Sequence, residues 1–300
     1  MQCFYTLPKI VKSQKSIYKY LCVLWNTFRN YKKCEIIIDF SSTRWIEPNM
    51  IAVLGLILVK LKSNKNKIVL RNLRLSIKEL LVKYEFIEPV DDLVIPENYI
   101  KYRTFNGDSN DDFRQYLEKQ LKNIKDLETI GLLISRLMEI FVNVKMHARK
   151  NTIKSKYRDK EIFSSGYYNR YNNYVIFTIA NNGMNFSQNI SKRLNYDMKN
   201  ECDFIDWALK KSNTTRINSP GGLGLFLLED LIKIYDGELI ILSGKGFYCE
   251  KKFQIEKEDF SLMFPGTVIT IKIPIISINT NEFLKKDTIY NITDLIMEEF

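Results

Sequence analysis

The sequence predicts an α+β protein of two domains, and three observations support this fold class. Predicted strands and helices alternate over residues 34–84, an order typical of α/β layers. Polar and turn-forming residues then gather over residues 88–112, which places a domain boundary near residue 100. Further along, a glycine cluster at residues 221–224 leads into an apolar helix. The chain has 300 residues, of which 45% are hydrophobic, enough for two cores.

The first domain, residues 1–100, carries a repeated strand–helix pattern. Apolar residues at spacings of three and four predict an amphipathic helix within residues 1–33. Two strands rich in β-branched residues each precede a helix, at residues 34–40, 50–62, 67–70 and 76–84. Asn49 or its neighbour is the expected cap of the first of these two helices. The short connections predict at least one parallel pair of strands.

The second domain is predicted to mix helices with hairpin strands. Helical periodicity covers residues 113–124 and 129–149, and an amphipathic segment covers residues 292–300. Strands are expected at residues 160–164, 175–179, 239–242, 247–253 and 267–273, the first two antiparallel. Residues 184–218 are polar, with one short helix expected near residues 204–209, and so long a connection is typical of a functional lid.

Composition narrows the class of protein. The five cysteines are scattered and the chain has one histidine, which disfavours a zinc site and indicates reduced thiols in a cytoplasmic protein. The net charge of +10 is spread along the chain without a basic run, which disfavours nucleic acid as the partner. Residues 50–61 are the longest apolar stretch and are too short to span a membrane, and the N-terminus lacks a signal-peptide pattern.

A row of polar residues interrupts the otherwise apolar helix expected at residues 129–149. Glu139, Asn143 and His147 are four residues apart and therefore share one helix face. Burying such a row is costly unless it faces a ligand or a wet cleft. The competing interpretation is a solvated helix face.

The glycine cluster offers a second polar feature. Glycines allow backbone N–H groups to approach a ligand closely, and a helix that begins there adds the positive end of its dipole. Together these favour a cradle for phosphate at residues 221–225. The competing interpretation is a turn before an ordinary buried helix.

Three motifs occur in a defined order: Glu139-x-x-x-Asn143 on a helix, a strand ending in Asn181-Asn182-Gly183, and the glycine cluster. This order resembles the GHKL ATPase superfamily, within which the branch of anti-sigma-factor-like kinases is most similar. The resemblance spans about residues 112–274. It implies a Bergerat sandwich with a mixed sheet and helices on one face over residues 101–275, a lid at about 184–220, and a tail at 276–300.

The resemblance also implies ATP and Mg²⁺ as cofactors and a role for each matching residue. Asn143 would hold Mg²⁺, and Glu139 would orient or deprotonate a water or hydroxyl. Nucleotide contacts are implied for His147, Asn181, Gly183, Thr214, Thr215, Arg216, Gly221, Gly222, Leu223, Gly224, Leu225 and Thr267. The family has aspartate where this chain has Asn181, and glycine where it has Asn185. An asparagine lacks the charge that favours adenine, and its NH₂ group also suits a guanine carbonyl.

Residues 36–54 separately resemble a STAS domain, the fold of anti-sigma-factor antagonists. That family places a phosphorylatable serine beside the start of a helix, whereas Glu47, Pro48 and Asn49 stand here, which argues against phosphorylation at this loop. As the only histidine, His147, lies within the motif helix, a self-contained histidine autokinase is not expected.

The function expected is a cytoplasmic Mg-ATP-binding signalling protein in which nucleotide closes the lid, with slow hydrolysis or phosphotransfer to a protein partner. A homodimer is compatible with a STAS-like module. One alternative is a degenerate GHKL fold that serves as a non-catalytic interaction module. Another is a serine/threonine kinase that acts on a separate STAS partner.

Overall fold

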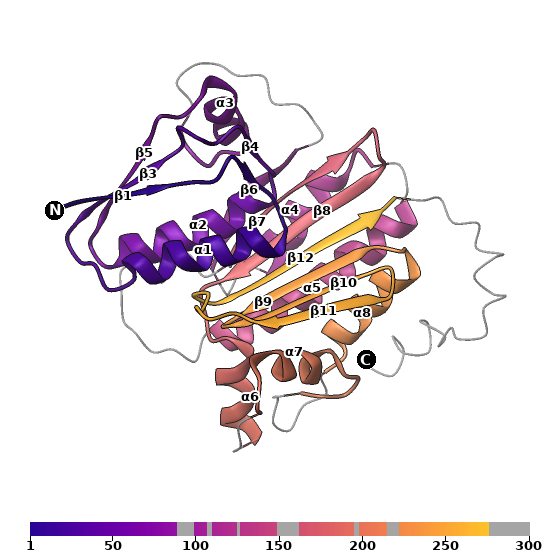
Figure 1. The fold of residues 1–300 in the computed structure, drawn as a ribbon. Helices are drawn as coiled ribbons and strands as arrows, with labels where there is room; N and C mark the ends of the chain where they lie inside the picture. The colour runs from indigo at the N-terminus through magenta and orange to yellow at the C-terminus, as the bar shows by residue number, and fades with distance from the viewer. Residues whose placement is uncertain are drawn as a thin grey trace.

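The structure, a computed structural model, is an α+β fold with a large antiparallel sheet (Figure 1). It describes residues 1–88, 99–106, 110–124, 127–148, 162–194, 198–214 and 222–275. The helices are α1 (Lys15–Phe28), α2 (Met50–Ser63), α3 (Leu75–Lys83), α4 (Asn110–Leu121), α5 (Leu127–Ala148), α6 (Phe186–Leu194), α7 (Glu201–Leu209) and α8 (Gly224–Ile234). The strands are β1 (Gln2–Thr6), β2 (Ile10–Val11), β3 (Glu35–Asp39), β4 (Trp45–Ile46), β5 (Lys67–Arg71), β6 (Tyr99–Phe105), β7 (Ile162–Asn169), β8 (Tyr174–Asn181), β9 (Glu238–Ser243), β10 (Gly246–Lys251), β11 (Gln254–Asp259) and β12 (Thr267–Pro274).

The N-terminal part contains a small parallel sheet in the order β1-β3-β5, which confirms the predicted parallel pairing. The helix expected within residues 1–33 begins only at Lys15, and strand β1 precedes it. Asn49 was wrongly expected to cap α2. Its backbone is already helical, and its side-chain amide donates instead to Thr178 Oγ1 at 3.1 Å.

The large sheet has the order β11-β10-β9-β12-β8-β7-β6, and every pairing in it is antiparallel. The mixed sheet expected from the resemblance is therefore wrong. Strands β8 and β9, which α6, α7 and α8 connect in the chain, run in the same direction. However, β12 lies between them and pairs antiparallel with both, so no parallel pair forms.

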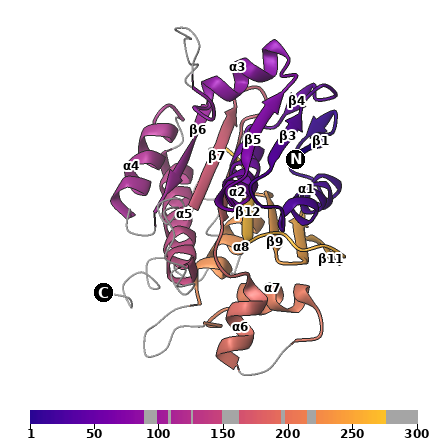
Figure 2. The same cartoon turned by 90° about the vertical axis from the view of Figure 1, so that its left-hand side faces the viewer.

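Both faces of the large sheet are covered by helices: α4, α5 and α8 from residues 101–275 lie on one face, and α1 and α2 of the N-terminal part lie on the other. In β8, Val175, Phe177 and Ile179 join the core beneath α4, α5 and α8, whereas Ala180 joins the core beneath α1 and α2. Figure 2 shows these two helical layers on opposite sides of the sheet. A nearly continuous apolar strand is typical of a sheet buried on both faces.

Buried polar contacts join the N-terminal part to the back of the large sheet. Ser165 Oγ on β7 accepts the backbone N–H of Ala52 at 3.0 Å and also lies 3.0 Å from the Pro48 and Asn49 carbonyl oxygens. Tyr18 on α1 lies 3.0 Å from Thr270 on β12. The boundary expected near residue 100 thus falls between segments that share one core, because residues from both parts occupy the same buried cluster.

Other segments refine the sequence-based expectations. Strands β6 and β11 were not predicted and form the two edges of the large sheet. The region expected as a lid contains α6 as well as the expected helix α7, both at one end of the sheet (Figures 1 and 2). The tail at residues 276–300 lies outside the described residues. Within the described part of the chain, every helix is too short or too polar to cross a membrane.

Candidate functional site

The polar row of α5 meets the first residue of α8. A Cβ atom added to Gly224 would lie 2.8 Å from Asn143 Nδ2 and 3.2 Å from Glu139 Oε2. A side chain at position 224 would displace both polar groups, because these distances are shorter than ordinary van der Waals contact. Two of the three motifs predicted to share a site therefore meet at the N-terminus of α8, where unpaired backbone N–H groups and the helix dipole attract anions.

The apolar residues of α5 explain why the polar row faces this point. Leu133, Leu137, Ile140 and Phe141 are all buried in the core beneath the large sheet. Glu139 and Asn143, which lie on the neighbouring strip of the helix, are partly exposed. The helix thus turns its apolar stripe toward the sheet and its polar row toward α8.

A narrow cavity adjoins Asn143 and extends to the end of β8. Its lining combines apolar side chains with amides and hydroxyls: Ile140, Asn143, Asn181, Met184, Phe186, Asn189, Ile190, Trp207, Ala208, Asn213, Thr214, Gly222, Gly224, Leu225, Thr267 and Ile269. The volume open to the centres of water molecules is about 70 Å³. Because one water needs about 10–15 Å³ on this measure, the cavity has room for about five waters, the scale of one ring system.

Asn181 and Thr267 face each other at the inner end of this narrow cavity. Asn181 is 3% exposed, and its Oδ1 accepts the backbone N–H of Thr267 at 3.1 Å. The Thr267 hydroxyl lies 2.7 Å from Ser243 Oγ, which in turn accepts the backbone N–H of Phe186 at 2.9 Å. This chain of contacts holds the start of α6 against the end of the sheet.

A second, wider cavity of about 650 Å³ opens on the other side of Asn143. Asn143, Gly222 and Gly224 line both cavities, so they form the junction between them. The wider cavity is also lined by Glu139 and Leu223, and by Arg114 from α4. A ligand with an apolar ring and a charged chain would fit across this junction, with its ring in the narrow cavity.

Glu139 is held by a neighbour on its own helix. Arg136 Nη1 lies 2.7 Å from Glu139 Oε1, and the Arg136 side chain is only 8% exposed. Such a charge-assisted hydrogen bond fixes the carboxylate more strongly than a neutral one would. With Oε1 held in this way, Oε2 is the oxygen that lies beside Gly224.

The glycine cluster also contacts the end of α7. The Gly222 carbonyl accepts the backbone N–H of Ser212 at 3.2 Å. Gly222 has a φ of +87°, and a Cβ atom there would lie 2.5 Å from the Asn213 carbonyl oxygen. This position requires glycine for its conformation and for its space.

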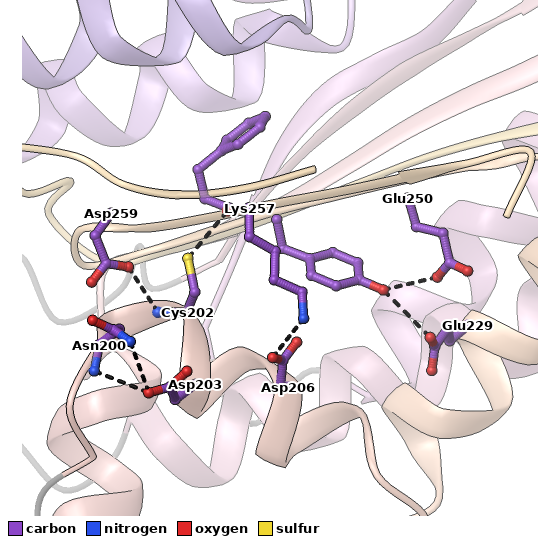
Figure 3. A network of polar contacts seen from close by, with 10 residues as sticks. Asn200, Cys202, Asp203, Asp206, Glu229, Glu250, Lys257 and Asp259 are labelled. Atoms are coloured by element: carbon purple, nitrogen blue, oxygen red, sulfur yellow. Dashed lines mark hydrogen bonds and ion pairs between the residues drawn. The ribbon is translucent and has the colours of Figure 1, made fainter. Parts of the chain in front are cut away.

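Helix α7 is anchored to the edge of the sheet through polar contacts (Figure 3). Asp259 accepts the backbone N–H groups of Glu201 and Cys202 at 2.8 and 2.9 Å, which satisfies donors of the first turn of α7. Lys257 forms an ion pair of 2.6 Å with Asp206 further along the helix. The α7 part of the expected lid is therefore tied to strand β11.

A second polar cluster in Figure 3 fixes α8. Glu229 pairs with Lys233 at 2.7 Å, and Tyr248 donates to Glu250 at 2.9 Å while its hydroxyl lies 3.4 Å from Glu229. Burial raises the pKa of the Glu229 carboxyl, and Lys233 opposes that shift. These contacts hold in place the helix whose first residue, Gly224, faces the site.

The predicted site residues fall into three groups. Those that line the two joined cavities are Glu139, Asn143, Asn181, Thr214, Gly222, Leu223, Gly224, Leu225 and Thr267. Gly183 lies in the turn after β8 and is not among the lining residues, and His147 belongs to α5 but its side chain is not described. Thr215, Arg216 and Gly221 lie outside the described residues.

Several residues that line the cavities or hold a lining residue in place were not predicted from the sequence. Arg136 sits one turn before Glu139, a spacing that signals contact on any helix, but nothing in the sequence shows that it is buried. Trp207, Asn189 and Asn213 come from the region expected as a lid, and only its fold brings them to the cavity.

The described residues contain no group of three or more His, Cys, Asp or Glu side chains able to hold a metal. A magnesium ion at this junction would therefore rely on Asn143 and on oxygen atoms of a ligand, a set that suits a hard cation. Comparison with models of protein families and with curated proteins finds no match for this chain. The function is consequently inferred from the site itself.

Proposed function

We propose that this chain is a signalling or regulatory protein that binds a purine nucleoside triphosphate with Mg²⁺, ATP being the nucleotide implied by the resemblance to GHKL proteins. The observation that carries the proposal is the meeting of Glu139, Asn143 and Gly224 at the junction of the two cavities. A carboxylate, an amide and a helix N-terminus at one point suit a magnesium-bound triphosphate.

Each part of the site has a distinct task in this proposal. The narrow cavity takes the base, and the wider cavity takes the phosphates. Backbone N–H groups at Gly222–Gly224 and the dipole of α8 stabilise phosphate charge. Asn143 provides an oxygen ligand to Mg²⁺, while Glu139 Oε2 orients a water or an acceptor hydroxyl toward the terminal phosphate.

Nucleotide-dependent closure of the expected lid is the proposed switching event. Gly222 accepts a hydrogen bond from Ser212, three residues after the end of α7, so a ligand that binds at the glycine cluster acts on this region directly. Because Asp259 anchors the first turn of α7 to the sheet, closure is restricted to the segments that follow the last turn of this helix. Order–disorder or hinge changes of this type convert phosphate binding into a signal.

The N-terminal part is proposed as a STAS-like module whose partner is another protein. Its loop at Glu47–Asn49 packs against Ser165 on the face of the sheet opposite α5. Phosphotransfer by this chain would thus require a hydroxyl on a separate chain, such as a STAS protein. A non-catalytic interaction module remains the second candidate, because Asn181 and Asn185 replace the residues that the GHKL family uses at the base.

Nucleotide titration of the full chain and two variants tests the proposal. Asn143→Ala is expected to lose Mg²⁺-dependent binding, whereas Glu139→Ala is expected to bind nucleotide and to lose turnover. Asn172→Ala, in the exposed turn between β7 and β8, is the matched control and should behave as the wild type. Wild-type affinity in Asn143→Ala would disprove the site. Binding without turnover in the wild type would favour the non-catalytic candidate.

A further inference from the structure

The amide of Asn181 has a fixed orientation at the inner end of the narrow cavity. Its Oδ1 lies 3.1 Å from the backbone nitrogen of Thr267. A backbone N–H can only donate, so the side-chain atom facing it must be the carbonyl oxygen. Asn181 is the last residue of β8 and pairs directly with Thr267 of β12, so the sheet register itself sets this contact.

This orientation determines what Asn181 can offer to a ligand. With Oδ1 engaged, the group that remains is the NH₂, which only donates. Within the described part of the chain, the contact to Thr267 is the side-chain hydrogen bond found for Asn181, and this residue lines the narrow cavity while being 3% exposed. A ligand that fills the cavity would exclude water from this NH₂ group, so the ligand itself would have to supply an acceptor or leave the donor unsatisfied.

We infer that the base site selects a purine with a carbonyl at position 6, guanine or hypoxanthine, over adenine. This inference rests on the proposed function and identifies the nucleotide class for the same site. The O6 atom of a 6-oxopurine accepts from Asn181 Nδ2. The 6-amino group of adenine is a donor and would face another donor, which leaves both unsatisfied.

The rest of the narrow cavity suits a flat purine without dictating which one. Ile140, Ile269 and Met184 provide apolar surface for the ring faces. The room for about five waters matches one base and excludes a whole nucleotide. Other amides and hydroxyls, among them Asn189 and Thr214, also line this cavity, and position 6 is assigned to Asn181 because the sheet fixes its amide at the end of β8.

Substitution of Asn181 by aspartate inverts the pattern of donors and acceptors. In Asn181→Asp one carboxylate oxygen still accepts the Thr267 N–H, and the other presents an acceptor to the cavity. That acceptor pairs with the adenine amino group and repels O6 of a 6-oxopurine. The variant has nearly the same shape, so the substitution changes hydrogen bonding more than packing.

The test is isothermal titration of the full-length protein with the Mg²⁺ complexes of GTP, ITP and ATP. The wild type is expected to bind GTP and ITP at least about tenfold more tightly than ATP, the scale set by one unsatisfied buried group. Because ITP lacks the 2-amino group, equal binding of ITP and GTP assigns the preference to position 6. In Asn181→Asp, ATP is expected to become the tightest of the three.

The outcomes separate this inference from the proposed function. ATP bound as tightly as GTP by the wild type overturns the inference and leaves the nucleotide site standing. No binding of any of the three overturns both. Tight GTP but weak ITP binding assigns selectivity to the 2-amino group and also overturns the inference. The wild-type comparison does not depend on whether Asn181→Asp folds, and the melting temperature of the variant without nucleotide reports on its fold.

Discussion

Replacing Gly224 with alanine, at the junction of the two cavities, is expected to change the stability of the protein little and its affinity for nucleotide strongly. The new Cβ atom would lie 2.8 Å from Asn143 Nδ2, against about 3.4 Å for ordinary contact, so the Asn143 amide must move by roughly 0.6 Å. The obstructing atom is the end of a side chain, which shifts at little cost. Alanine also favours a helix over glycine by at most about 1 kcal/mol. The free energy of unfolding should therefore change by no more than about 1 kcal/mol.

Mg²⁺-dependent nucleotide binding should respond much more strongly. Mg²⁺ demands near-ideal octahedral geometry, and the new Cβ displaces the amide proposed to hold it, so we expect at least about a tenfold loss of affinity in Gly224→Ala. Urea denaturation and calorimetric titration measure the two effects on the same protein. Gly131→Ala on α5 is the control for folding, because its added Cβ meets nothing within 4 Å and only the gain in helix propensity should remain. Asn172→Ala, in the exposed turn between β7 and β8, is the control for affinity and should bind as the wild type does. Wild-type affinity in Gly224→Ala would refute the role given to Asn143.

Three further predictions concern stability. Arg136→Met should lower the free energy of unfolding by about 1–3 kcal/mol, because it breaks the 2.7 Å contact to Glu139. The control Arg114→Met, at an exposed position, should change it by less than about 0.5 kcal/mol. Equal urea midpoints for the two variants would contradict this prediction. Burial lowers the pKa of Lys60 from 10.5 to about 8, so the folded state binds fewer protons between those values and stability should rise as pH increases through that window. Lys60→Met should remove this rise, because methionine carries no charge. It should also stabilise the protein at pH 7 by about 1–3 kcal/mol, because it removes the cost of burying the ammonium group, of which the contact with the Trp25 ring offsets only a part. Identical pH profiles for the wild type and the variant would argue against this prediction. Ser165→Ala should cost about 1–3 kcal/mol in a single urea transition, because it leaves the Ala52 N–H unpaired in the shared core, and two separate transitions would show that the two parts unfold independently.

Local sequence patterns correctly predicted the polar row on α5 and the helix that begins at the glycine cluster. Glu139 and Asn143 share a helix face because of their spacing alone, and the glycine cluster does begin a helix at Gly224. These motifs are far apart in the chain, so the sequence does not show that they are close in space. Their proximity follows from the packing of α5 against α8. The orientation of the Asn181 amide likewise depends on the register of β8 with β12, a long-range feature absent from any local pattern.

The errors in the fold have equally physical causes. Strand β11 consists mostly of exposed charged residues, which is typical of a protected sheet edge and carries little hydrophobic signal. Strand β1 is only half buried, and its short alternation was merged with the stronger helical period of α1. The mixed sheet was expected from the resemblance, whereas β12, from the end of the described fold, lies between β8 and β9 and pairs antiparallel with both.

Hydrogen–deuterium exchange with and without a Mg²⁺-nucleoside triphosphate tests most directly whether the junction of the two cavities is the nucleotide site. Bound nucleotide should slow exchange at the backbone amides of residues 222–225, where N–H groups are proposed to meet phosphate, and at residues 181–184 beside the base. It should leave β1 and β5 of the N-terminal sheet unchanged. Protection that appears elsewhere, or no protection at a nucleotide concentration that saturates binding, would contradict this assignment.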